Sequence, residues 1–231
     1  VASPLGTELF VLGGILLAAS LIPMVLSRKA GPIVNEVAPM SLLALLRLSP
    51  LGVVSCFVSG IIYSSAFNLL PVFANLYGIV EFDLSIYMGA AILGAFLLQF
   101  PVGWLSDKFD RRTVLLSILI VSALTGFSVS FLASQNWFWL MSVATAITCG
   151  IIATTYPLSI SESFDRLRQS EMVAAMGSLI IAFSLGGIIG PFSTSLVMAT
   201  YGTDNLFWFL GFIQIGLGIF VVYRMTARQA L

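Results

Sequence analysis

Hydrophobic and polar positions alternate along the chain in seven long apolar runs separated by polar connections. The runs cover residues 9–26, 51–77, 85–105, 113–133, 137–160, 172–200 and 206–224. Roughly 20 helical residues, rising 1.5 Å each, cross the ~30 Å hydrocarbon core of a bilayer, and helices satisfy their own backbone hydrogen bonds in lipid. The pattern therefore predicts an all-α integral membrane protein with seven transmembrane helices.

Basic residues occur only in every second connection. They are Arg28, Lys29, Arg47, Lys108, Arg111, Arg112, Arg166, Arg168, Arg224 and Arg228, whereas the alternate connections carry Glu81, Asp83, Gln135, Asn136 and Asp204. Basic loops stay on the cytoplasmic side of a membrane. The pattern predicts a cytoplasmic C-terminus and, counted back over seven crossings, an outside start at Val1. An outside start at a residue other than Met predicts a fragment that lacks an odd number of upstream spans.

The longest connection predicts a boundary between two helix bundles. It covers residues 27–50 and holds three prolines around the apolar stretch Met40–Leu48, which is too short to cross a membrane. We expect a short helix there, lying along the inner interface. The predicted domains are a last helix of an N-terminal bundle (1–27), a cytoplasmic linker (28–50) and a C-terminal six-helix bundle (51–231). Pro71 and Pro157, at matching offsets in runs two and five, indicate two inverted triplets of spans.

Composition excludes several classes of function. The chain is 59% hydrophobic and 9% charged, with zero net charge and no His, whereas a soluble domain carries about 25% charged residues. The basic residues are thus a topological signal, and we predict no nucleic-acid partner. We also predict no cofactor or metal, and we read Cys56 and Cys149 as small buried apolar residues. No paired membrane carboxylates or catalytic base are present, which argues against an enzyme.

The connection between runs three and four carries a family resemblance. It resembles the G-x-L-x-D-R-x-G-R-[RK]-x-[VL]-[LI] loop of the major facilitator superfamily, with matches at Gly103, Leu105, Asp107, Arg111, Arg112, Val114 and Leu115. Lys108 replaces an Arg of that pattern, and Asp110 replaces its second Gly. Because Asp tolerates a left-handed backbone better than most residues, we expect Asp110 to keep the turn.

The chemistry of this loop predicts a gate. Gly103 allows another helix to approach closely, and Asp107 can lie against a helix N-terminus, which favours a carboxylate by about 0.3–1 kcal/mol. Arg111 and Arg112 can pair with acids or bind anionic headgroups. Contacts that form in one conformation and break in another bias a two-state equilibrium. The alternative is that Lys108 and the two arginines only fix topology.

The resemblance covers the whole chain as spans six to twelve of a twelve-span transporter. It implies a secondary transporter that moves a small organic solute across the bacterial inner (plasma) membrane by alternating access. Its partners would be that solute, membrane lipid and a missing N-terminal bundle. Three further segments resemble the YcaD-type bacterial subgroup: Tyr156-Pro157, Gly186-Gly187-x-x-Gly190-Pro191 and Asp204-Asn205-Leu206. A transport-inactive membrane scaffold or regulatory subunit with the same fold is the alternative function.

Polar side chains within the apolar runs are candidates for a solute cavity. They are Tyr63 and Asn68 in run two, and Thr148, Thr155 and Tyr156 in run five. Since an amide or hydroxyl in hydrocarbon requires a partner, the alternative for each residue is a hydrogen bond between helices. We read the lone amides Gln99 and Gln214 as structural pairs. No charged residue lies deep in any run, so this part of the protein offers no carboxylate for proton coupling.

Two further groups have structural interpretations. Gly186 and Gly190 are four residues apart and predict close helix packing, and Pro191 predicts a bend. The connection after run five carries both signs of charge, at Glu162, Asp165, Arg166, Arg168 and Glu171. We expect a solvated loop there, with closure against the Asp107 loop as the alternative.

Overall fold

The computed structural model describes residues 7–26 and 40–229, which belong to two units, Val1–Glu36 and Val37–Leu231. The first unit contains α1 (Glu8–Ser20) and α2 (Ile22–Leu26). Its apolar helical stretch, Phe10–Leu26, has 17 residues, about 26 Å at 1.5 Å per residue, less than the ~30 Å of a hydrocarbon core. The helix is interrupted at Leu21, two residues before Pro23, which has no backbone N–H to donate.

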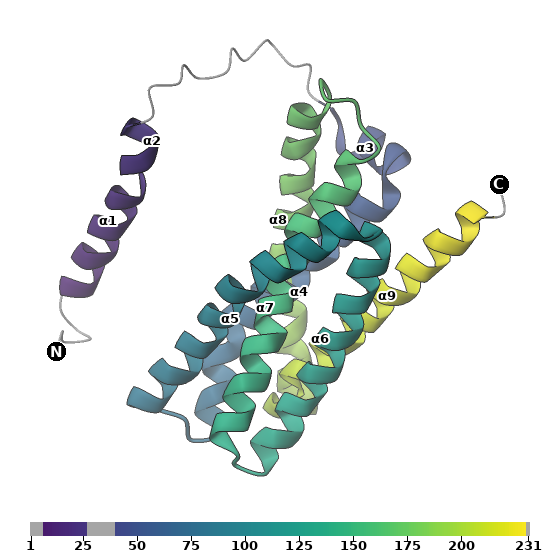
Figure 1. Ribbon diagram of the computed structural model, residues 1–231. Coiled ribbons are helices and arrows are strands. Elements are labelled where there is room, and N and C mark those ends of the chain that lie inside the picture. Colours follow the sequence, from purple (N-terminus) through teal and green to yellow (C-terminus); the bar gives the residue numbers. More distant parts are fainter. Residues whose placement is uncertain (1–6, 27–39, 230–231) are drawn as a thin grey trace. The chain divides into compact units, whose positions relative to one another are not determined.

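The second unit consists of one short and six long helices among the described residues. They are α3 (Leu42–Leu48), α4 (Pro50–Leu76), α5 (Glu81–Lys108), α6 (Arg111–Ser134), α7 (Phe138–Phe164), α8 (Met172–Tyr201) and α9 (Leu206–Gln229), with a 3₁₀ turn, η1 (Thr203–Asn205), before α9 (Figure 1). The six long helices are sufficiently long and apolar to cross a membrane. The expected all-helical membrane fold is thus confirmed for six spans, with a shorter apolar helix in place of the first run.

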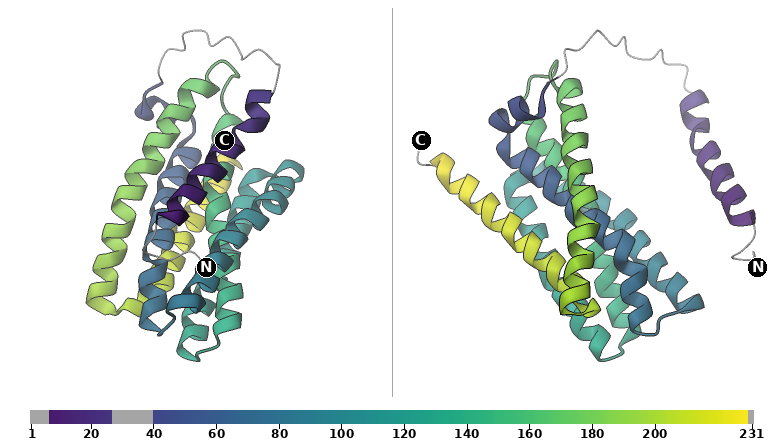
Figure 2. Two further views of the ribbon diagram at one scale, coloured as in Figure 1. Left: turned by 90° about the vertical axis from the view of Figure 1, so that its left-hand side faces the viewer. Right: turned by 180° about the vertical axis from the view of Figure 1, so that it is seen from behind.

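Two helix pairs form the most extensive interfaces of this unit, α4 with α8 and α5 with α7. Seen from behind, α8 crosses α4 (Figure 2). If α4, α5 and α6 correspond to α7, α8 and α9 in that order, the α4–α8 pair corresponds to the α7–α5 pair. This is the relation expected of inverted repeats. Pro71 and Pro157 lie inside α4 and α7, which correspond to each other in this relation.

Glycines make the α4–α8 pair close. A Cβ on Gly186 would overlap the carbonyl oxygen of Phe57, and a Cβ on Gly190 would lie 2.5 Å from the carbonyl oxygen of Ile61. From the other side, a Cβ on Gly60 would overlap a backbone carbonyl of α8. The two glycines of α8 lie at its contact with α4, where a larger residue would separate the helices. Pro191 follows within the same helix.

The described basic residues gather at one end of the six-helix unit, which we call the inner end. It contains the junctions between α5 and α6 and between α7 and α8, together with α3 (Figure 1). Glu81, Asp83 and Asp204 lie at the junctions of the opposite end. Arg47 is on α3, whose Leu45 is fully buried in a cluster with residues of α4 and α8. Ser178 of α8 also donates a hydrogen bond to the carbonyl of Met40. The short helix expected in the linker therefore packs with the six-helix unit.

Candidate functional site

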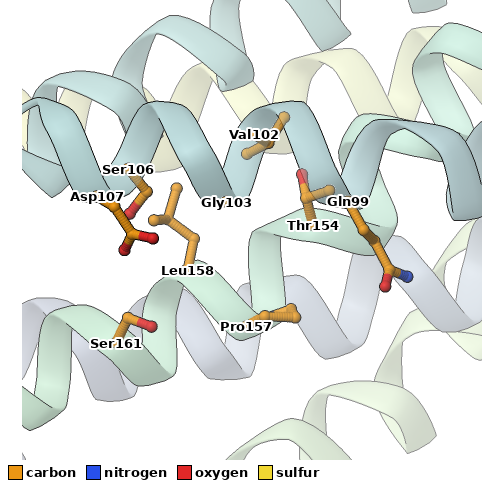
Figure 3. Close-up of a pocket in the computed structure, with 9 residues that line it drawn as sticks. All are labelled: Gln99, Val102, Gly103, Ser106, Asp107, Thr154, Pro157, Leu158 and Ser161. Atoms are coloured by element: carbon orange, nitrogen blue, oxygen red, sulfur yellow. The ribbon is translucent and has the colours of Figure 1, made fainter.

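A groove of about 220 Å³ lies between α5 and α7 at the inner end of the unit. Figure 3 shows its lining residues: Gln99, Val102, Gly103, Ser106 and Asp107 of α5, and Thr154, Pro157, Leu158 and Ser161 of α7. The two helices cross closely further along, where a Cβ on Gly94 would overlap the carbonyl of Ala146. The groove lies between the inner halves of the same two helices. We refer to it as the inner groove.

The inner groove brings together the first half of the expected gating motif. Gly103 and Asp107 both line it. Leu105 packs instead against the apolar cluster between α4, α6, α7 and α9. Lys108 extends over the ring of Trp104, with its Nζ 3.9 Å from the ring centroid, a cation–π contact. The motif thus has one face in the groove, one in the apolar core and one at the exposed surface.

Gly103 and Asp107 are both open. A Cβ added to Gly103 would meet no atom within 4 Å. The Asp107 carboxylate is exposed and makes no hydrogen bond or ion pair with any residue in the described part of the chain. Neither residue is therefore required by contacts inside this unit.

The second half of the motif, Arg111 and Arg112, forms ion pairs within the unit. Arg111 donates to the carbonyl of Ser161 at 2.7 Å and pairs with Asp165 at 3.2 Å. Arg112 Nε lies 3.3 Å from Oε1 of Glu162. Both arginines begin α6, and all three partners belong to the end of α7 or follow it directly. The alternative, that these arginines only fix topology, does not account for these contacts.

Asp110 corrects an expectation. Its backbone has φ −56° and ψ 123°, so it does not adopt the left-handed conformation, and the prediction of a retained left-handed turn was wrong. Its side chain instead caps α6, accepting hydrogen bonds from the backbone N–H and the hydroxyl of Thr113 at 3.1 and 3.2 Å. Such a cap contributes about 1 kcal/mol to a helix start. The sequence signal was available, because Asp directly before the start of a predicted helix is a common N-cap residue.

Glu162 is the centre of an inner-end network that the sequence did not reveal. Its side chain is 4% exposed, and its Oε1 accepts from Arg112 and from Arg166 at 3.3 and 3.0 Å. Its Oε2 accepts from the hydroxyl of Ser49, directly before α4, at 3.2 Å. The prediction of a solvated loop was thus wrong for Glu162, which is buried. Its carboxylate can be buried because two arginines pair with it. The network joins the starts of α4 and α6 to the end of α7.

Among the other charged residues of that segment, Asp165 and Arg168 have side chains that are 54% and 85% exposed, as expected of a solvated loop, whereas the Arg166 side chain is only 20% exposed. Glu171 pairs with Arg168 at 3.1 Å, and the Arg168 side chain is 85% exposed. The backbone N–H of Arg168, and then its guanidinium, donate to the Glu171 carboxylate and lower the pKa of Glu171 below its ordinary value. No group of three or more His, Cys, Asp or Glu in the described ranges could hold a metal ion.

The five expected cavity residues separate into two groups. Tyr63, Asn68 and Tyr156 lie on an exposed or half-buried face of α4 and α7. The ring of Phe183 on α8 lies between the two tyrosines, 6.0 Å from Tyr63 and 4.3 Å from Tyr156 between centroids. We call Tyr63, Phe67, Asn68, Tyr156 and Phe183 the aromatic face. The Nδ2 of Asn68 donates hydrogen bonds within α4, to the carbonyl and the hydroxyl of Ser64 at 2.7 and 3.2 Å.

The other two residues lie inside the bundle. Thr148 is buried and bonds to the hydroxyl of Thr125 on α6 at 2.8 Å, and Thr155 is buried and donates to the carbonyl of Ile151 at 3.1 Å. The Thr148 hydroxyl thus joins two helices, which was the alternative left open for it, and the Thr155 hydroxyl is satisfied within α7. Sequence reasoning missed Phe183 because an apolar aromatic in an apolar run gives no signal.

Comparison with known proteins gives the family. The sequence profile of the Major Facilitator Superfamily matches residues 6–166 and 52–230. Several proteins called "Uncharacterized MFS-type transporter YcaD" are also similar to the chain. The protein of Escherichia fergusonii is 29% identical over 217 residues, which is 93% of this chain and 54% of the relative. The proteins of Escherichia coli O139:H28 and Shigella sonnei are each 28% identical over 214 residues, 92% of this chain and 53% of the relative.

The chain therefore spans about half the length of the curated relatives that it matches. The family expected from residues 103–115 is confirmed by a match that covers most of the sequence. With six apolar helices long enough to cross a bilayer, the chain is a multi-pass membrane protein that belongs to the Major Facilitator Superfamily, a family of transporters rather than enzymes.

Proposed function

We propose that the chain forms the second half of a secondary transporter that moves a small organic solute across the cytoplasmic membrane by alternating access. One observation carries the proposal. The gating motif is divided, because Arg111 and Arg112 are held by the end of α7 whereas Gly103 and Asp107 stand open in the inner groove. The engaged half keeps the inner end together, and the open half remains free to contact a second bundle.

The open half of the motif fits a contact that forms and breaks. Since no atom lies within 4 Å of a Cβ on Gly103, the benefit of glycine there is room for an element outside this unit. Asp107 lies at the same groove, where the N-terminus of an approaching helix would favour its carboxylate by about 0.3–1 kcal/mol. A difference of that size changes a two-state population about two- to fivefold.

The aromatic face is the proposed wall of the solute path. It presents Tyr63, Tyr156 and Phe183 around one half-exposed surface, and the exposed Asn68 follows Tyr63 by five residues on α4. Charged residues of the six long helices are confined to their ends. Such a wall provides stacking area and hydroxyl and amide hydrogen bonds without a fixed charge. It suits an uncharged or weakly polar organic solute.

The remaining parts of the proposal follow from the relatives' length. A first bundle of the kind that fills the other half of such proteins would complete the path, and Phe10–Leu26 would be the last span of that bundle and the first of the seven spans expected in this chain. The basic inner end would face the cytoplasm, together with the C-terminus. Labelling of single cysteines at Arg111 and Glu81 by an impermeant reagent should occur from opposite sides of the membrane. Labelling from the same side would refute this topology.

The gate is tested by replacing Gly103 with a larger residue, since a side chain at this position would meet no atom of the unit. In the full-length protein in liposomes, Gly103→Leu should block the close approach and lower transport at least tenfold, without a change in thermal stability. Gly89→Leu is the matched control, because Gly89 is also on α5 and also has nothing within 4 Å of its Cβ. Asp107→Asn should shift the balance of inward- and outward-open states. Equal transport by both glycine variants and by Asp107→Asn would overturn the gating role.

The solute is found by thermal stabilisation. A ligand that binds the folded protein raises its unfolding midpoint by mass action, so a panel of small uncharged organic compounds can be screened while the solute is still unidentified. A hit should lose affinity in Tyr63→Ala and Asn68→Ala, with uptake falling in parallel. A hit that binds but is never transported by the intact protein would favour the scaffold or regulatory alternative.

A further inference from the structure

A pocket of about 200 Å³ lies at the end of the six-helix unit opposite to the inner end. Its walls come from the junction between α4 and α5 and from the junction between α6 and α7, which both lie at the lower end of the unit in Figure 1. We call it the outer pocket. It shares no lining residue with the inner groove and contains no residue of the aromatic face.

Three polar residues line the outer pocket. They are Tyr77, directly after α4, Asp83, in the first turn of α5, and Asn136, between α6 and α7. Their side chains make no hydrogen bond or ion pair with any residue that the structure describes. Asp83 is exposed, and the described basic residues lie at the inner end, so no described cation pairs with its carboxylate. The start of a helix favours a carboxylate, but this does not account for the two other unpartnered groups.

The electrostatic surroundings of the outer pocket are negative. Burial, and then the carboxylate of Asp204, raise the pKa of Tyr77 above its ordinary value, so its hydroxyl is neutral at pH 7. Asp204 belongs to the turn η1, and its charge therefore acts on one wall of the pocket from a third junction. The charged residues described at this end of the unit, Glu81, Asp83 and Asp204, are all acidic. Uncompensated negative charge beside neutral hydrogen-bond acceptors favours a cation.

The apolar part of the wall matches an organic cation better than a metal ion. Ile79, Ala133 and Met141 line the pocket and are at most 8% exposed, and the half-buried Phe138 lies beside them on its wall. Contact with such a wall favours an alkyl chain. Among the described residues, no group of three or more His, Cys, Asp or Glu could hold a metal ion. The volume equals that of roughly seven waters in the liquid, which is room for a short chain.

We propose that the outer pocket binds a primary ammonium group that carries a short apolar chain. The carboxylate of Asp83 would pair with the ammonium, and the side-chain oxygens of Tyr77 and Asn136 would accept its remaining hydrogen bonds. The chain would contact Ile79 and Met141. Such an ammonium occurs both in free amines and in the headgroup of phosphatidylethanolamine. The site is separate from the proposed solute path and does not depend on transport.

The test measures the binding of butylamine to the full-length protein in nanodiscs of phosphatidylcholine, a lipid without a primary ammonium. Butylamine is protonated at pH 7, as a lysine side chain is. Saturation-transfer NMR should show binding that saturates with concentration and is absent from empty nanodiscs. Butan-1-ol, which has the same chain without the charge, should bind about fivefold more weakly or less, because the charged hydrogen bonds are lost. Tetramethylammonium, a cation without N–H donors, should also bind more weakly than butylamine.

Two matched variants separate the pocket from the general charge of this end. Asp83→Asn should weaken the binding of butylamine about fivefold. Glu81→Gln is the control, because Glu81 is in the same first turn of α5 and is also acidic and exposed, but does not line the pocket. It should bind butylamine normally. Both side chains are exposed, so neither change should prevent folding, and the unfolding midpoint of each variant verifies this.

Several results would overturn the proposal. Equal weakening in Asp83→Asn and Glu81→Gln would mean that the acidic end attracts cations without a specific site. Equal binding of butylamine and butan-1-ol would mean that only the apolar wall contributes. The absence of a saturable signal would mean that the pocket is closed or filled in the full-length protein. Phosphatidylethanolamine added to the nanodiscs distinguishes the two sources of the ammonium: displacement of butylamine would support a lipid headgroup, and continued binding would support a free amine.

Discussion

Neutralising Glu162 should destabilise the protein through the loss of one buried charge. The variant is Glu162→Gln, which preserves shape and one hydrogen-bond acceptor at the position of Oε1. Glu162 has a 4% exposed side chain and contacts Arg112 and Arg166 through the same oxygen, while Ser49 donates to the other oxygen. After the change, two guanidinium groups would share a neutral amide, and no carboxylate would compensate them.

The magnitude follows from the burial of the partners. Removing one member of a fully buried ion pair costs about 3–5 kcal/mol. The side chains of Arg112 and Arg166 are 14% and 20% exposed, so both can recover part of their hydration. The retained hydrogen bonds reduce the loss further. We therefore expect about 1–2 kcal/mol, which corresponds to a fall of roughly 2–8 °C in the unfolding midpoint for a unit of this size.

The assay can use the two cysteines of the chain. Cys56 and Cys149 are both buried, so a thiol-reactive dye labels them only as the protein unfolds, and fluorescence gives the midpoint. The matched control is Glu171→Gln, in the pair with the exposed Arg168, where a clearly smaller change is expected. The double variant with Arg112→Gln should lose less than the sum of the two single variants, because the partners are coupled. Equal midpoints for Glu162→Gln and Glu171→Gln would refute the inner-end network.

Two further predictions concern helix packing. Gly186→Ala should strongly destabilise the unit, because a Cβ would overlap a carbonyl of α4, whereas Gly187→Ala should be tolerated, since its Cβ would lie 3.8 Å from the nearest atom; equal unfolding midpoints would contradict the close α4–α8 crossing. Tyr87→Phe should cost about 1 kcal/mol, because it removes the buried 2.8 Å hydrogen bond between Tyr87 and Thr145. A midpoint unchanged in Tyr87→Phe would mean that this bond contributes nothing to the α5–α7 pair.

Features that depend on local sequence, such as helix length, could be predicted. Which face of a helix packs against its neighbours could not. Apolar run lengths predicted the six long helices, because a bilayer requires a fixed helical length. The spacing of Gly186 and Gly190 predicted a close contact, because residues four apart share a helix face. By contrast, hydroxyl side chains occur on several sides of α7, so the sequence did not show which side faces a cavity and which side packs against other helices. Thr148 and Thr155 therefore looked like cavity residues, although both are buried.

Glu162 illustrates the same limit for charge. The segment after run five is polar, and a polar connection normally implies a solvated loop. The burial of Glu162 depends on the starts of α4 and α6, which bring Ser49 and Arg112 to it from 113 and 50 residues away. No local pattern encodes such distances. The capping role of Asp110 was encoded locally, by contrast, and was missed because the family pattern directed attention to a left-handed glycine.

The contacts of α5 connect these observations to the proposed gate. Its buried residues are only Tyr87, Ala91, Gly94 and Ser106. The first three lie in its outer half, where Tyr87 bonds to α7 and Gly94 makes the close crossing. In its inner half, one side of α5 packs against the apolar core and the other lines the inner groove. The arginines that follow anchor α6 to α7, so they do not hold that groove-facing side. Nothing within the described residues requires the glycine or the aspartate at that side, which supports the proposed contact of Gly103 and Asp107 with a second bundle.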